Sequence, residues 1–390
     1  MTVITGQMEE TNYLSNYYRD KVPMNIYKSN TQLSPTTVVQ PFNTRSYPLR
    51  STYSILECLG HGTYGEVYRA KMNETGEIVS IKRMIDAFDT ISHAKSALRE
   101  IKILSNIKHK NIVTFYEILA PSSFNQFNDV YFVMEAMDMD LRWVIDNQSL
   151  SMNHVKYMSY QILCAINCLH QNGLIHRDLK PGNILVNKDS LTKICDLGLA
   201  REKKETMSLY VVSRWYRAPE LLLECEYNEK IDIWAYGLII YEMVGHTPLL
   251  RCNNVLAQLE LIFSYFGIPS DVSFINNSSA LQFVQSCYSK VKPKSISLFH
   301  NSQIDPLFLD LLSKCLQVDP RKRWNAYQLL HHPYFEDIFN EDDLYVQSCS
   351  DAIQLNIDSC NTKDIPLLKK QAYLEMLKYH PELLYTNRSQ

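Results

Sequence analysis

The chain has 390 residues and a net charge of −3, with 46% apolar and 21% charged residues, which is the composition of a folded globular protein. This charge balance gives no sign of a nucleic-acid-binding or membrane-binding protein, and no apolar run is long enough to cross a bilayer. Ten scattered cysteines without a CxxC pair argue against a disulfide framework or a zinc site, so we expect reduced thiols and a location in the cytoplasm and nucleus.

The first half of the chain predicts a flexible arm and a β-rich lobe. Residues 1–48 are polar and lack apolar periodicity, so we expect a flexible N-terminal arm. From residue 53 onward, "YSILECLG", "EVYRAKM" and "IVSIKRM" predict three antiparallel strands joined by a glycine-rich turn and by "NETGE". "SALREIKILSNI" predicts an amphipathic helix, and two more β-rich runs follow. These elements define a small lobe over residues 49–137.

After Met137 the pattern becomes helical. Ser151 is the expected N-cap of a helix that ends near Gly173, and "KIDIWAYGLIIYEMVG" is apolar on all sides, as in a buried helix. Residues 138–340 therefore form a predicted helical lobe, and residues 341–390 a C-terminal extension with a further helix. Strands followed by helices predict an α+β protein with two lobes and a cleft between them.

A glycine-rich motif lies in the first predicted turn. Gly60, Gly62 and Gly65 form a G-x-G-x-x-G pattern, in which backbone N–H groups can approach phosphates closely. A tight hairpin explains the same glycines equally well. A dinucleotide-binding dehydrogenase does not fit, because the motif lies between two strands rather than between a strand and a helix.

Two groups of polar residues fit phosphoryl-transfer chemistry. Lys82 ends the third predicted strand and could hold phosphates, oriented by Glu100 of the next helix. "HRDLKPGN" at residues 176–183 and the following "DLG" supply a base, a cation and two metal ligands within a short span. The four residues, in those roles, are Asp178, Lys180, Asn183 and Asp196.

The ordered motifs "GHGTYGEV", "VSIK", "HRDLKPGN", "DLG" and "APE" resemble those of eukaryotic Ser/Thr protein kinases over residues 53–335. "SRWYRAPE" is similar to the segment of the branch that contains mitogen-activated protein (MAP) kinases and cyclin-dependent kinases. "HAKSALREIKIL" resembles the MAP kinase helix rather than a cyclin-binding helix. The resemblance implies ATP and Mg²⁺ as cofactors and proteins with Ser-Pro or Thr-Pro sites as substrates. It also implies that Arg323 pairs with Glu220 and that Asp232 supports the catalytic loop.

The same resemblance assigns a nucleotide site. It makes Met134 the gatekeeper, Glu135 and Met137 the hinge partners of adenine, and Asp140 a neighbour of the ribose. The whole implied ATP-binding set is Gly60, His61, Gly62, Thr63, Tyr64, Gly65, Val67, Ser80, Lys82, Met134, Glu135, Met137, Asp140 and Leu185. Leu197, Ser80 and Gly182 depart from the usual family residues, and they support the alternative of a catalytically weak scaffold that binds partners.

A tripeptide before "SRWYRAPE" resembles the activation loop of MAP kinases. Ser208-Leu209-Tyr210 begins twelve positions after Asp196, a length similar to the stress-activated Thr-Gly-Tyr subgroup. The resemblance implies phosphorylation of Ser208 and Tyr210 by an upstream dual-specificity MAP kinase kinase. Five arginines could receive the two phosphates: Arg99, Arg177 and Arg201 for Ser208, and Arg214 and Arg217 for Tyr210.

"FNEDDLY" lies where MAP kinases keep an acidic docking groove. Asp342 and Asp343 would supply its charges to basic docking peptides and phosphatases, although an acidic run can also be an ordinary solvated face. We expect a monomer without nucleic-acid or membrane partners.

Overall fold

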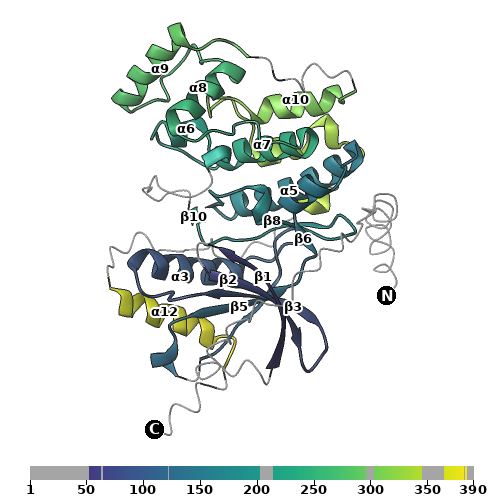
Figure 1. The fold of residues 1–390 in the computed structure, drawn as a ribbon, viewed down its shortest axis with the longest axis vertical. Coiled ribbons are helices and arrows are strands. Elements are labelled where there is room, and N and C mark those ends of the chain that lie inside the picture. The colour runs from purple at the N-terminus through teal and green to yellow at the C-terminus, as the bar shows by residue number, and fades with distance from the viewer. Residues whose placement is uncertain are drawn as a thin grey trace, which may run out of the picture.

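The computed structural model describes residues 52–62, 65–121, 123–202, 214–294, 296, 303–344, 364–381 and 383. The predicted N-terminal arm, Thr63, Tyr64, Ser208 and Tyr210 lie outside this described part, and the side chain of Arg214 does too. Figure 1 shows the two lobes one above the other, with the strand-rich lobe below and the helical lobe above.

The small lobe is a five-stranded antiparallel sheet with one helix against it. The strand order is β1-β2-β3-β5-β4. Both faces of the sheet are covered, because Tyr131 and Val133 enter one apolar cluster while Phe132 and Met134 enter the other. This alternation explains why strand β5 reads as a continuous apolar run. The bounds are β1 (Tyr53–Gly62), β2 (Gly65–Met72), β3 (Ile78–Met84), β4 (Phe115–Ile118), β5 (Val130–Glu135) and α3 (Ile91–Asn106).

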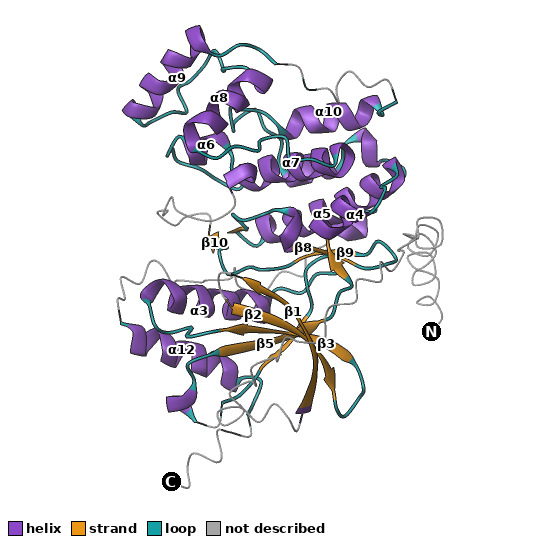
Figure 2. Cartoon of the chain, viewed as in Figure 1, coloured by secondary structure: helices purple, strands orange, loops and turns teal. Residues whose placement is uncertain are grey.

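The large lobe is helical, as Figure 2 shows. Ser151 caps α5 through the N–H of His154, and α5 ends before Gly173, whose φ is +74°. Helix α7 is buried from Ile231 to Met243, so it forms the centre of this lobe. The bounds are α4 (Leu141–Asn147), α5 (Met152–Gln171), α6 (Pro219–Leu222), α7 (Lys230–Gly245), α8 (Val255–Phe266), α9 (Ser278–Lys290), α10 (Pro306–Cys315) and α11 (Ala326–Leu330). The predicted α+β fold with two lobes is confirmed.

Two small sheets and short 3-10 turns carry the polar segments between the lobes. One sheet has the order β6-β8-β9, and the other pairs β10 with β7. These elements are β6 (Met139–Asp140), β7 (Leu174–Ile175), β8 (Ile184–Val186), β9 (Thr192–Ile194), β10 (Arg201–Glu202), η2 (Pro181–Asn183) and η3 (Arg214–Tyr216).

The C-terminal helix α12 (Ile365–Leu377) lies against α3 of the small lobe (Figure 1). It buries Leu368, Ala372 and Met376, and His380 beyond its end bonds the carbonyl of Ile118 at 2.7 Å. The C-terminal extension therefore returns to the small lobe. Within the described residues, no helix combines the length and apolar character needed to span a membrane.

Candidate active site

The three glycines of the motif lie where strands β1 and β2 pair. Gly60 lies opposite Val67, His61 opposite Glu66, and Gly62 opposite Gly65. Gly65 has φ +141°, and a Cβ there would lie 1.8 Å from the carbonyl oxygen of Arg83 on β3. Glycine is therefore required at this position by sheet geometry. The hairpin is present, and whether it covers phosphates stays a prediction.

A lysine and two carboxylates meet beneath the hairpin. Lys82 Nζ of β3 lies 2.6 Å from Glu100 Oε1 of α3 and 2.9 Å from Asp196 Oδ1. Lys82 reaches this face because its neighbour Ile81 points into the opposite core. Three segments that are far apart in the sequence thus share one ammonium group.

Burial and charge act in opposite directions on this cluster. For Asp196, burial favours the protonated form, but Lys82 outweighs it and lowers the pKa of the carboxyl. For Glu100, burial dominates and raises the pKa, although Lys82 opposes it. The nearby carboxylates raise the pKa of Lys82 despite its burial, so the lysine stays charged. The cluster therefore holds a fixed cation beside the ionised carboxylate of Asp196.

The residues after Asp196 fit tightly against α3. Leu197 is fully buried, so an apolar side chain other than Phe fills this position. A Cβ on Gly198 would lie 3.1 Å from Glu100 Oε2, so glycine allows the glutamate its close approach. Asp196 itself has φ +61°, a conformation that non-glycine residues seldom adopt outside functional sites.

The loop that holds Asp178 is ordered by its own side chains. Lys180 Nζ donates to Asp178 Oδ2 at 2.7 Å, and Asn183 Nδ2 donates to the same oxygen at 3.1 Å and to the carbonyl of Asp178 at 2.8 Å. These bonds fix a buried carboxylate within the loop. A carboxylate held this way can accept a proton or orient a hydroxyl group.

Asp232 of the buried helix α7 supports this loop from below. Its two oxygens accept hydrogen bonds from the backbone N–H groups of His176 at 2.8 Å and Arg177 at 2.9 Å, and His170 Nε2 lies 2.9 Å away. Burial alone would raise the pKa of Asp232, but His170 and the other donors lower it, so the carboxylate is ionised. Arg177 is held at φ +73° by this contact.

The predicted metal ligands lie on adjacent segments. The N–H of Cys195 bonds the carbonyl of Asn183 at 3.0 Å, which brings Asp196 beside Asn183. Because the amide nitrogen of Asn183 bonds Asp178, its oxygen is left for a metal. In the described residues no group of three or more His, Cys, Asp or Glu side chains could hold a metal. One amide oxygen and one carboxylate fit Mg²⁺, which is usually completed by substrate phosphates and water.

The predicted adenine and ribose residues line the join between the lobes. Ser80 of β3 pairs with Met134 of β5, and Leu185 pairs with Asp140. Met134 and Met137 are buried. The carboxylate of Asp140 caps α4 by accepting from the N–H of Trp143 at 2.7 Å, and burial raises its pKa. Asp140 thus has a structural task that the sequence prediction did not include.

A protein-kinase-domain family matches residues 53–335 of this chain. "Extracellular signal-regulated kinase 1" of Dictyostelium discoideum is 42% identical over 85% of the chain, which spans 63% of that protein. "Mitogen-activated protein kinase 7" of Arabidopsis thaliana is 38% identical over 87% of the chain and 93% of its own length. The chain belongs to the mitogen-activated protein kinases. The resemblance to this Ser/Thr kinase family is confirmed.

The "APE" segment of this MAP kinase is fixed by a buried ion pair. Arg323 NH1 lies 2.7 Å from Glu220 Oε1 and NH2 lies 3.1 Å from Oε2, and neither side chain is exposed. The guanidinium also donates to the carbonyls of Lys230 and Gln317. The pairing expected from the resemblance is present.

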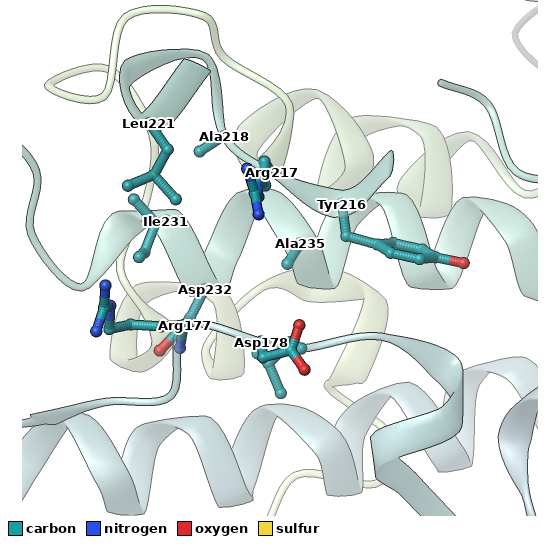
Figure 3. A pocket seen from close by; sticks show the side chains of 10 residues that line it. Arg177, Asp178, Tyr216, Arg217, Ala218, Leu221, Ile231, Asp232 and Ala235 are labelled. Carbon is teal, nitrogen blue, oxygen red and sulfur yellow. The ribbon is translucent and has the colours of Figure 1, made fainter. Parts of the chain in front are cut away.

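A small cavity lies between this segment and the loop of Asp178 (Figure 3). Arg217 comes from the segment between η3 and α6, and Arg177, Asp178 and Asp232 lie on the opposite wall. Arg217 therefore lies beside the catalytic loop. The role predicted for it with phospho-Tyr210 cannot be placed, because Tyr210 lies outside the described residues.

The arginines predicted for phospho-Ser208 gather around one short stretch. Arg99 NH1 of α3 donates to the carbonyl of Gly198 at 3.3 Å, and Arg177 NH1 to that of Leu199 at 3.5 Å. Arg201 pairs with Ile175 between β10 and β7. All three arginines thus contact or belong to the stretch that leads into the activation loop.

One of the two aspartates expected in the acidic docking groove has an ion-pair partner. Asp342 is exposed, but Asp343 is buried and forms an ion pair with Lys110. Asp343 thus has a partner that is distant in sequence, and the docking role of the two aspartates stays a prediction.

Sequence reasoning missed a buried network beside the cavity. Glu242 of α7 is fully buried, accepts a hydrogen bond from Tyr216 at 2.6 Å, and forms an ion pair with Arg142 of α4. It joins the hinge-side helix to the turn before Arg217. A single acidic residue inside the apolar run "LIIYEMV" was the available signal, because buried charges need partners.

Proposed function

We propose that this MAP kinase is an ATP- and Mg²⁺-dependent, proline-directed Ser/Thr kinase that is switched on by phosphorylation of Ser208 and Tyr210. The observation that carries the proposal is the ion-paired cluster of Lys82, Glu100 and Asp196 beside the ordered carboxylate of Asp178. This arrangement supplies a base, cations and a metal-ligand pair in one cleft.

Each side chain has a separate task in this proposal. Asp178 accepts the hydrogen bond of the substrate hydroxyl and takes its proton, as the hydroxyl oxygen forms a bond to the γ-phosphorus and the bond to ADP breaks. Lys180 neutralises charge on the transferred group, and Lys82 holds the α- and β-phosphates. When bound at Asn183 and Asp196, Mg²⁺ supplies charge neutralisation of the phosphates.

Regulation follows from the arginines around the activation loop. A phosphate adds about −1.5 to −2 charges, and Arg99, Arg177 and Arg201 could bind one on Ser208. We propose an upstream dual-specificity kinase as activator, docking peptides and phosphatases as partners, a monomeric state, and a location in the cytoplasm and nucleus. The relatives' names support protein substrates and upstream kinases only in general terms.

The test compares two peptides that differ only after the target serine, Ser-Pro and Ser-Ala. Protein phosphorylated on Ser208 and Tyr210 should phosphorylate the Ser-Pro peptide with Mg-ATP, and the Asp178→Asn variant should be inactive. Equal use of both peptides would remove the proline preference. No turnover, together with no thermal stabilisation by Mg-ATP, would make the chain the partner-binding scaffold considered above.

A further inference from the structure

A groove of about 540 Å³ lies outside the nucleotide cleft, at the N-terminal end of α12. Three segments line it: the loop between β3 and α3 with Phe88, the connection between β4 and β5 with Phe124 and Asn128, and the first turns of α12 with Leu367 and Lys369. Its volume is in the range of sites for small molecules. Nothing in the phosphoryl-transfer chemistry uses these residues.

The floor of the groove is formed by aromatic side chains, and each packs against another ring. Phe88 packs against Phe127 with ring centroids 5.2 Å apart, and Phe124 packs edge-on against Tyr373 at 5.1 Å. On the open side, Phe124 is 39% exposed and Leu367 is 40% exposed. Large apolar side chains held open to solvent provide area that a ligand would cover favourably.

A lysine stands over this floor. Lys369 Nζ lies 5.3 Å from the ring centroid of Phe124 and 5.9 Å from that of Phe88, and it donates to Asn128 Oδ1 at 3.0 Å. Burial lowers the pKa of Lys369.

No carboxylate in the described part of the chain lies within ion-pair distance of Lys369. Of the two aspartates on the groove wall, Asp364 caps α12 through the N–H of Leu367, and Asp89 is exposed. The ammonium group is thus partly desolvated, and a neutral amide is its acceptor among the described residues. An anion would be a better partner.

We propose that this groove binds a small amphipathic carboxylate. Its aromatic or branched aliphatic body covers Phe88 and Phe124, and its carboxylate pairs with Lys369. A phosphate fits less well. The described lining has a second lysine, the exposed Lys370, but no arginine for a bidentate contact; Pro366 has no N–H, and the N–H of Leu367 already bonds Asp364. The site would respond to a metabolite or drug-like acid independently of the nucleotide.

The test titrates the full-length protein with 4-phenylbutyrate, followed by ligand-observed NMR in the presence of saturating Mg-ADP. We expect saturable binding. The neutral analogue 4-phenyl-1-butanol should bind about tenfold more weakly, because it lacks the charge-assisted hydrogen bond. Absence of saturable binding, or displacement by Mg-ADP, would overturn the proposal.

Variants locate the site. Lys369→Met keeps the apolar stem and should weaken binding of the acid about tenfold without affecting the alcohol. Lys378→Met is the matched control, since Lys378 lies at the other end of α12 and pairs with Glu375; it should bind within about twofold of the wild type. Phe124→Ser should weaken both ligands. Unchanged acid binding in folded Lys369→Met, checked by its melting temperature, would show that the groove is not the site.

Discussion

Two ion-pair clusters use the same chemistry in different surroundings. In the large lobe, Arg323 and Glu220 are fully buried, and the guanidinium also bonds two backbone carbonyls. In the cluster of Lys82, Glu100 and Asp196, the side chain of Lys82 is 13% exposed and that of Asp196 28%, and Asp196 has a left-handed backbone. The first cluster has all its bonds satisfied by fixed partners, so it can only hold structure. The second is partly exposed, and in the proposed function its charges bind phosphates and a metal. Mutations should separate these two roles.

The largest effect is expected for the fully buried pair of Arg323 and Glu220. Arg323→Met leaves the carboxylate of Glu220 buried without its counter-charge, so the free energy of unfolding should fall by about 3–5 kcal/mol. Urea denaturation measures it. The double variant Glu220→Met/Arg323→Met removes both charges and should recover part of the loss. A single variant as stable as the wild type would mean that this pair is not structural.

A mutation in the partly exposed cluster of Lys82, Glu100 and Asp196 should lower activity more than stability. Lys82→Met removes the cation shared by Glu100 and Asp196, and kcat of the phosphorylated enzyme should fall by about 10²–10³-fold. Stability should fall less than in Arg323→Met, because Glu100 can take up a proton and water can reach the cluster. Peptide phosphorylation and urea denaturation of the same preparation test both statements. A stability loss equal to that of Arg323→Met would remove the contrast.

The third prediction concerns the pH dependence of stability and a histidine outside both clusters. Burial lowers the pKa of His109 from 6.5 to about 4. The unfolded chain therefore binds a proton near pH 6.5 that the folded chain does not. Stability should be full above pH 6.5 and should fall by about 2–3 kcal/mol as the pH drops toward 4. In His109→Asn the contribution of His109 should be absent, so the loss of stability should be smaller than in the wild type, as measured by unfolding at pH 7, 5.5 and 4.5. Asp196 stays ionised in this range because its pKa is lowered.

The smallest effect tests the fit around Glu100. Gly198→Ala places a methyl group 3.1 Å from Glu100 Oε2 and should lower kcat/KM about tenfold by displacing the carboxylate from Lys82. Gly182→Ala is the control, since a Cβ there meets no atom within 4 Å; it should stay within about twofold of the wild type. If both variants behave alike, the tight contact at Gly198 has no role in positioning Glu100.

Much of the fold followed from local sequence patterns. The strands of the hairpin, the Ser151-capped helix and the buried helix with Asp232 are each signalled by periodicity or a capping residue close in sequence. Motif spacing also indicated the residues of the cleft, and the structure brings Lys82, Glu100 and Asp196 into contact.

Contacts between distant segments could not be predicted in this way. The pairing of Arg142 with Glu242 spans 100 residues, and that of Lys110 with Asp343 spans 233. A single sequence gives the charge of each residue but not the partner that compensates it. The partner of Asp343 was not predicted for this reason, and the groove beside Lys369 was not predicted either.

The position of α12 has a consequence for how the protein is made. This helix covers α3, and His380 bonds Ile118 across 262 residues. During synthesis, the small lobe leaves the ribosome long before the helix that covers it. Until then the face of α3 that α12 covers is open to solvent, and the helix that carries Glu100 lacks the packing of Leu368, Ala372 and Met376. The packing of α3 is thus completed by a segment that is synthesised after the whole large lobe.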